Sequence, residues 1–93
     1  MKQSKNESNI IKKYTNIRIK EDTVFKKDYI EKKFGYSGSK LFDNEGNFTC
    51  KFYTNNIEKL VNEIMNVGKW NLICVSEDEK SLCYHFIKEE TQN

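Results

Sequence analysis

Residues 55–88, which read NNIEKLVNEIMNVGKWNLICVSEDEKSLCYHFIK, decide how this chain folds. In the first part of this stretch apolar residues recur at helical spacing, with polar residues on the opposite side, which predicts an amphipathic helix. The apolar positions are Ile57, Leu60, Val61, Ile64, Met65 and Val67. Asn55 and Glu58 have the spacing of a capping box, and Gly68 stands where a left-handed C-cap residue belongs.

The second part of the stretch predicts a hairpin. Two runs with alternating apolar residues, 71–76 and 81–87, flank a polar turn over residues 77–80. Trp70 begins the return of the chain after the helix. The segment therefore contributes one helix and two antiparallel strands.

The register of this hairpin determines which residues lie opposite its two cysteines. If the turn centres on residues 78 and 79, Cys74 lies opposite Cys83 and Leu72 lies opposite His85. We expect the thiols to be reduced, since three cysteines at irregular spacing do not form a disulfide framework. In this register mild oxidation links Cys74 to Cys83 in preference to Cys50.

The first half of the chain is less regular. Residues 1–9 predict a disordered tail, because they hold too few apolar groups to offset the entropy of ordering. Ile10 to Lys20 predicts a strand, and Val24 to Phe34 predicts a helix capped by Asp22 or Thr23. Residues 40–43 and 47–54 then predict a hairpin about Asn44-Glu45-Gly46.

Together these elements predict one α+β domain over residues 10–93, in β-α-β-β-α-β-β order. Short turns join most of the strands, so an antiparallel sheet of four to five strands with two helices packed on one face is the economical arrangement. A shift of 34 residues aligns Phe48–Phe52 with Leu82–Phe86, which leaves open a duplicated unit of helix plus hairpin.

Residues 47–88 resemble a small uncharacterised bacterial domain family with strand-helix-strand-strand order. Its helix ends in Gly-Trp-Glu-Leu and leads to a strand and an aromatic-rich closing strand. The matching text here is Leu60-Val61-Asn62-Glu63-Ile64, then Gly68-Lys69-Trp70-Asn71-Leu72, then Tyr84-His85-Phe86-Ile87-Lys88. This chain inserts Lys69 and has Asn71 in place of Glu. The resemblance implies the fold and no activity.

Charge is unevenly distributed along the chain. Residues 1–40 hold eleven Lys or Arg and five acids, a balance of +6, whereas residues 41–93 hold five and nine, a balance of −4. Such polarity can orient a protein toward an acidic partner or help it to self-associate. The candidate basic surface consists of Lys12, Lys13, Arg18, Lys20, Lys26, Lys27, Lys32 and Lys33. The candidate acidic patch consists of Glu77, Asp78 and Glu79.

The sequence contains no motif that specifies catalysis, a cofactor or a metal. A structural zinc site usually uses closely spaced Cys or His pairs, and the chain has no Cys-x-x-Cys. Cys83 and His85 stand two apart on one strand, so they point the same way without facing each other. We therefore expect no enzyme activity, no cofactor and no metal.

Composition indicates the origin of the chain more than its mechanism. With fifteen Lys, one Arg, no Ala and no Pro, the chain is typical of a low-GC bacterium or its mobile elements. No apolar run spans a bilayer and no signal peptide precedes the domain, so we expect a cytoplasmic protein that does not contact membranes. The leading hypothesis is a small non-enzymatic protein-interaction module, an accessory or inhibitor protein of the anti-defence or anti-CRISPR type encoded by a phage or mobile element.

The alternative is a nucleic-acid-binding protein that uses the Lys-rich first half, where tyrosines are interleaved with the basic residues. Against it stands the single Arg, the best reader of bases. The most favoured partner is another protein, such as a host or defence-system protein. Pairing with a second copy is also left open.

Overall fold

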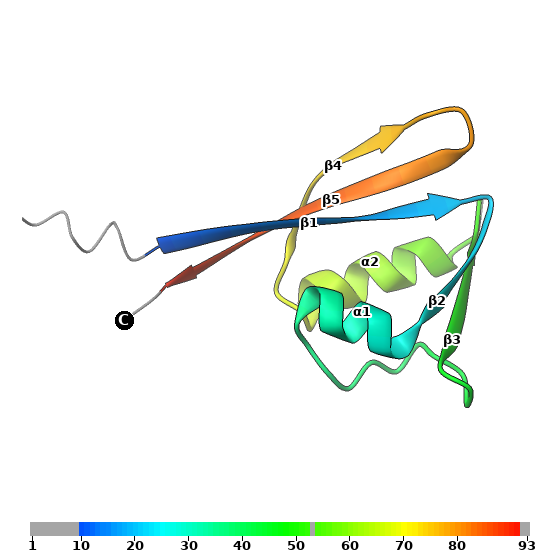
Figure 1. The fold of residues 1–93 in the computed structure, drawn as a ribbon, viewed down its shortest axis with the longest axis horizontal. Helices are drawn as coiled ribbons and strands as arrows, with labels where there is room; N and C mark the ends of the chain where they lie inside the picture. Colours follow the sequence, from blue (N-terminus) through cyan, green and yellow to red (C-terminus); the bar gives the residue numbers. More distant parts are fainter. Residues whose placement is uncertain (1–9, 53, 92–93) are drawn as a thin grey trace, which may run out of the picture.

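The structure is a computed structural model that describes residues 10–52 and 54–91. The predicted tail, residues 1–9, lies outside the described residues. The elements in chain order are β1 (Ile10–Lys20), β2 (Asp22–Lys26), α1 (Lys27–Phe34), β3 (Asn47–Lys51), α2 (Asn56–Asn66), β4 (Asn71–Glu77) and β5 (Ser81–Thr91) (Figure 1).

The α+β class and the two helices are confirmed, but the strands form two antiparallel sheets and not one. β5 is the central strand of a three-stranded sheet between β1 and β4, and β2 pairs with β3 in a separate ribbon. The chain leaves the first sheet at Glu21, where the Lys20 backbone N–H donates to the Thr23 hydroxyl at 2.7 Å. Both helices lie on the same side of the three-stranded sheet (Figure 1).

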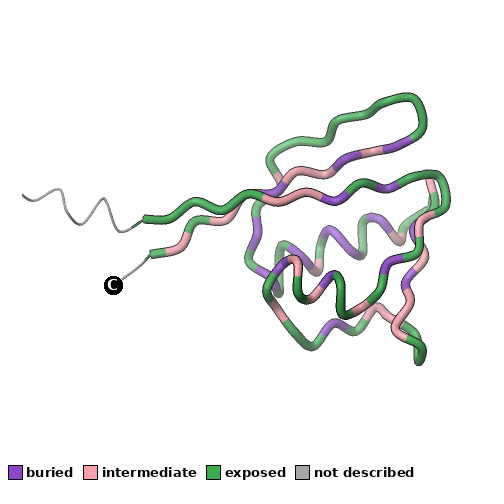
Figure 2. Tube along the Cα trace, in the orientation of Figure 1, coloured by how far each residue is buried: buried purple, intermediate pink, exposed green. Residues whose placement is uncertain are grey.

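The core lies between this sheet, the two helices and the β2–β3 ribbon (Figure 2). Phe34 from α1 stands at its centre, with its ring edge-on to Phe86 at 5.4 Å and to Trp70 at 5.8 Å between centroids. The largest fully buried side chains are Phe34, Phe86, Ile19, Ile30, Leu60, Ile64 and Cys50. Four residues of the predicted apolar stripe pack inward, whereas Met65 and Val67 are exposed; the four are Ile57, Leu60, Val61 and Ile64.

The predicted helix over Val24–Phe34 is too long at its start. Residues 22–26 form β2, and α1 begins at Lys27 without a side-chain cap, so neither Asp22 nor Thr23 caps it. β-branched and aromatic residues favour strands, and Phe25 lies directly opposite Phe48 in the ribbon. Burial of this cross-strand pair outweighs the helical spacing of the sequence.

The predicted hairpin over residues 40–43 and 47–54 is also wrong. β3 pairs with β2, and residues 40–43 form no strand, with a bend at Leu41 and Phe42. The Asp43 carboxylate accepts the backbone N–H groups of Glu45 and Asn47, both at 2.9 Å, which closes a local turn. The unit of helix plus hairpin is therefore not repeated in the two halves.

The loop after α1 is fastened by a carboxylate from α2. Glu63 accepts the Tyr36 hydroxyl at 2.8 Å, the Ser39 hydroxyl at 2.6 Å and the Lys40 backbone N–H at 3.1 Å. Burial, and then the hydrogen bond to Glu63, raise the pKa of Tyr36 above its ordinary value. Glu63 thus holds the loop against the helix layer.

The predicted caps of α2 are not made. Asn55 forms no side-chain cap bond; instead, the Asn56 amide donates to the Thr49 carbonyl at 2.6 Å and ties the start of the helix to β3. Lys69, and not Gly68, adopts the left-handed conformation, with φ 65°. A Cβ at Gly68 would lie 2.7 Å from the Ile64 carbonyl oxygen. The position therefore requires glycine because the backbone of α2 lies too close to admit a side chain.

Replacing Gly68 with alanine is expected to lower the free energy of unfolding by about 1–3 kcal/mol, the usual range for overpacking. Gly38→Ala is the matched control, because nothing lies within 4 Å of its Cβ position and its cost comes from φ +83° alone. Urea unfolding of both variants checks this. Equal stability of Gly68→Ala and the parent would mean that the helix end moves to admit the methyl group.

The terminal hairpin forms as predicted, but in another register. Cys74 lies opposite His85, Ser76 opposite Cys83, and the pairing shifts between Leu72 and Cys74. This irregularity adds a residue on β4, which sequence alternation cannot reveal. Cys74 is therefore not directly opposite Cys83, and the geometric basis of the preferred Cys74–Cys83 link is lost.

β1 and β5 extend past the rest of the sheet. Ile10 pairs with Thr91 and Lys13 with Lys88, whereas β4 reaches only Ile87. These outer residues form a two-stranded arm that projects from the body (Figure 1). Among the described residues, no helix is both long and apolar enough to cross a membrane.

Candidate functional site

A basic cleft of about 530 Å³ lies where the end of α1 meets the base of the β1–β5 arm. Four lysines from three elements line it: Lys13 from β1, Lys32 and Lys33 from α1, and Lys88 from β5. We call it the lysine cleft. It contains three of the eight residues of the candidate basic surface and adds Lys88, which the sequence analysis missed.

One wall of the lysine cleft is formed by the buried Trp70. The Trp70 indole N–H donates to the Phe34 carbonyl oxygen at 2.8 Å, one of the carbonyls that the end of α1 leaves free. The Lys88 ammonium lies 5.6 Å from the centre of the Trp70 ring, within cation–π range. Lys32 and Lys33 occupy the last turn of α1, where the helix dipole favours cations.

Glu90 supplies a negative charge within the lysine cleft. Its carboxylate lies 3.0 Å from the Lys13 ammonium and 3.7 Å from that of Lys88. The hydrogen bond from Lys13 is the main cause that lowers the pKa of Glu90. In contrast, Lys32 and Lys33 make no ion pair within the described ranges, and Lys33 lies over the Tyr29 ring at 5.4 Å.

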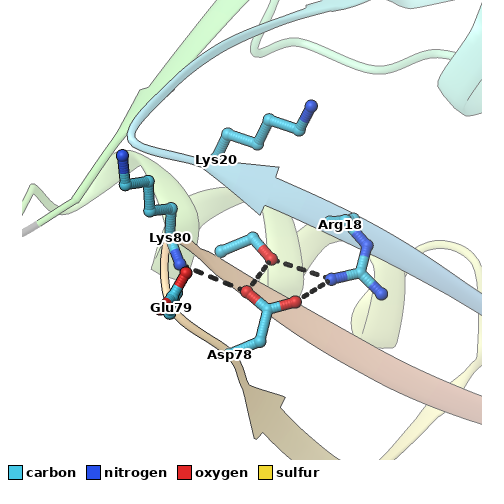
Figure 3. Close-up of a pocket in the computed structure, with 6 residues that line it drawn as sticks. Arg18, Lys20, Asp78, Glu79 and Lys80 are labelled. Atoms are coloured by element: carbon cyan, nitrogen blue, oxygen red, sulfur yellow. Dashed lines mark hydrogen bonds and ion pairs between the residues drawn. The ribbon is translucent and has the colours of Figure 1, made fainter.

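A second cleft, of about 570 Å³, lies at the other end of the three-stranded sheet, beside the β4–β5 turn (Figure 3). Arg18 from β1 donates from one guanidinium nitrogen to the Asp78 carboxylate at 2.9 Å and to the Ser81 hydroxyl at 2.8 Å. The Ser81 hydroxyl donates in turn to Asp78 at 2.7 Å. Lys20, Glu79 and Lys80 complete the lining.

Asp78 is therefore a structural residue of the turn. The Ser81 hydroxyl is the main cause that lowers its pKa, followed by the Lys80 backbone N–H, and Arg18 adds to the effect. The only arginine of the chain is thus engaged with the candidate acidic patch. Of that patch, Glu77 and Glu79 are exposed, and neither makes an ion pair in the part of the chain that the structure describes.

The other residues of the candidate basic surface do not join the lysine cleft. Lys20 lies in the cleft of Figure 3. The remaining three each lie near a polar partner: Glu89 for Lys12 (3.9 Å), Asn47 for Lys26 (2.6 Å) and Glu31 for Lys27 (3.9 Å). The predicted basic surface is therefore divided among several regions.

The outer face of the three-stranded sheet carries a chain of hydrogen bonds centred on His85. Its Nδ1 lies 2.5 Å from the Tyr14 hydroxyl and its Nε2 lies 2.9 Å from the Ser76 hydroxyl. The Asn16 amide donates to the Tyr14 hydroxyl at 3.2 Å. The imidazole thus joins β1 to β4 across β5.

The cysteines do not gather with this histidine. Cys50 is buried in β3, in the other sheet, and burial raises the pKa of its thiol to about 11, the opposite of what an activated nucleophile needs. Cys83 is buried and Cys74 is exposed. Within residues 10–52 and 54–91, no three His, Cys, Asp or Glu side chains are placed to hold a metal ion.

Sequence reasoning missed Trp70, Lys88 and Glu90 because they reach the lysine cleft only through tertiary packing. Alternation along β5 does group residues 86, 88 and 90 on one face, which was a usable signal. Comparison of the chain with protein-family models, with curated proteins and with solved structures gives no match, so the candidate site depends on its own geometry.

Proposed function

We propose that this protein is a small non-enzymatic interaction module that binds an acidic surface of another protein through the lysine cleft. The observation that carries the proposal is the convergence of four lysines on one cleft, beside a buried Trp70 that is hydrogen-bonded to the end of α1. Charged groups around a fixed cleft steer a complementary partner and set its orientation. A module of this kind acts as an accessory or inhibitor by covering a surface of its partner.

Two features favour a protein partner over a nucleic acid. Glu90 pairs with Lys13 and Lys88, which leaves only Lys32 and Lys33 of the cleft without an ion pair among the described residues, too few free charges to follow a phosphate backbone. In addition, Ile10 and Ile11 are exposed on the arm that leads away from the cleft, and the exposed Tyr14 lines the cleft itself. Apolar and aromatic side chains beside charged ones are typical of protein interfaces.

The test is affinity capture from a low-GC bacterial lysate with the parent protein and Lys32→Glu/Lys33→Glu. The double variant is expected to lose at least about tenfold in affinity for the captured protein, since about 1.4 kcal/mol corresponds to tenfold. Lys20→Glu/Lys51→Glu is the control, because it makes the same charge change at two exposed lysines outside the lysine cleft. Its binding should match that of the parent.

The two outcomes that count against the proposal are distinct. Equal loss in both double variants would mean that overall charge, and not the lysine cleft, attracts the partner. Retardation of DNA or RNA in a low-salt gel shift, lost in Lys32→Glu/Lys33→Glu and falling steeply with salt, would support the nucleic-acid alternative instead.

A further inference from the structure

β4 is an edge strand with an open side. β5 pairs with it on one side, and in the described part of the chain no strand pairs with the other (Figure 1). Nearly the whole of β4 is exposed (Figure 2). An edge strand presents unpaired backbone N–H and C=O groups, and proteins usually protect it with lysine, proline or a bulge. β4 contains neither lysine nor proline, and only the irregularity between Leu72 and Cys74 disturbs it.

Apolar side chains are exposed on the strand that forms this open edge. Ile73 and Val75 are 52% and 45% exposed, which is unusual for β-branched residues in the middle of a strand. A single exposed apolar residue needs no explanation, but two on an unpaired edge form a surface that association would cover. The edge therefore offers both backbone hydrogen bonds and apolar area.

The charges at the two ends of β4 are opposite. Lys69 precedes the strand and is exposed, while Glu77 and Glu79 lie at or beyond its other end. None of these three makes an ion pair among the described residues, whereas the neighbouring Asp78 is held by Arg18. In an antiparallel pair the start of one strand lies beside the end of the other, so this polarity is self-complementary.

We propose that β4 pairs antiparallel with β4 of a second copy of this chain about a two-fold axis near Cys74. A two-fold interface uses the same patch on both subunits, and such dimers are the commonest oligomers. Ile73 of each copy then lies beside Val75 of the other, and Lys69 faces the acidic end of the partner strand. The two three-stranded sheets join into one six-stranded sheet, on a surface separate from the lysine cleft.

The test uses sedimentation and a thiol crosslink. The parent should show a concentration-dependent dimer, and a short bismaleimide should trap it through Cys74, since the other two thiols are buried. Lys69→Glu and Glu79→Lys should each weaken dimerisation about tenfold. An equimolar mixture of the two variants should restore it, because each interface then regains opposite charges.

Controls separate this inference from the proposed function. Lys32→Glu/Lys33→Glu should dimerise as the parent does, and Cys74→Ser should dimerise without crosslinking. A monomer in sedimentation at every concentration reached overturns the proposal. A dimer that is unchanged by Val75→Lys, or not rescued by mixing the charge variants, shows that another surface pairs and overturns it equally.

Discussion

Replacing Phe86 with alanine is expected to lower the free energy of unfolding by about 3–5 kcal/mol, the usual cost of removing a buried phenylalanine. Phe86 is fully buried on the central strand of the three-stranded sheet, and the ring of Phe34 stands edge-on to it. The change removes ring contacts and leaves a cavity between the sheet and both helices. Because small domains have a total stability of only about 5–15 kcal/mol, a large share of the free energy of unfolding is lost.

Chemical denaturation followed by tryptophan fluorescence measures this effect, since Trp70 contacts Phe34 in the same cluster. Val24→Ala is the control: it removes an exposed side chain from β2, and its effect should stay within about 0.5 kcal/mol. If Phe86→Ala cost no more than Val24→Ala, the helices would not depend on the three-stranded sheet for their packing.

Replacing Glu63 with alanine is expected to cost about 2–3 kcal/mol, because hydrogen bonds to charged groups contribute more than neutral ones. The change removes the acceptor shared by the Tyr36 and Ser39 hydroxyls and by the Lys40 backbone N–H. The loop after α1 loses its attachment to α2, and its amides should exchange with solvent faster.

Glu63→Gln serves as the graded comparison. The amide keeps one oxygen acceptor, so the cost should be about half that of alanine. Hydrogen exchange of residues 36–40 in the folded state, together with urea unfolding, distinguishes local from global loss. Identical exchange in the alanine variant and the parent would mean that the loop is held by its apolar contacts alone.

The sequence predicts the elements that depend on local periodicity, but not those that depend on pairing between distant segments. β1 and α2 follow from local periodicity, and the structure confirms them. The sequence predicts the second part of β2, from Val24 on, as helix because Phe25 and Tyr29 have helical spacing. The stabilising contact of Phe25 is instead with Phe48, 23 residues away in the chain. Single-sequence patterns do not include such pairing.

The candidate site divides in the same way: the sequence predicts some of its residues, but tertiary packing decides which of them lie together. Lys13, Lys32 and Lys33 were predicted as basic surface from composition, yet only the packing of α1 against the sheet brings them together with Lys88. Arg18 and Asp78 were assigned to opposite patches, and the register of β1 on β5 places them in one ion pair. Charge counts along a chain do not reveal which charges neutralise each other.

The pairing of β1 with β5 has a consequence for how the chain reaches its native state. Ile17 and Ile19 are buried at the sheet, but their neighbours on β5, Tyr84 and Leu82, lie more than 60 residues later in the chain. Contacts at such separation require closure of a long loop before they stabilise anything, which slows folding. During synthesis β1 therefore stays unpaired, with these two isoleucines uncovered, until residues 82–84 of β5 have been made.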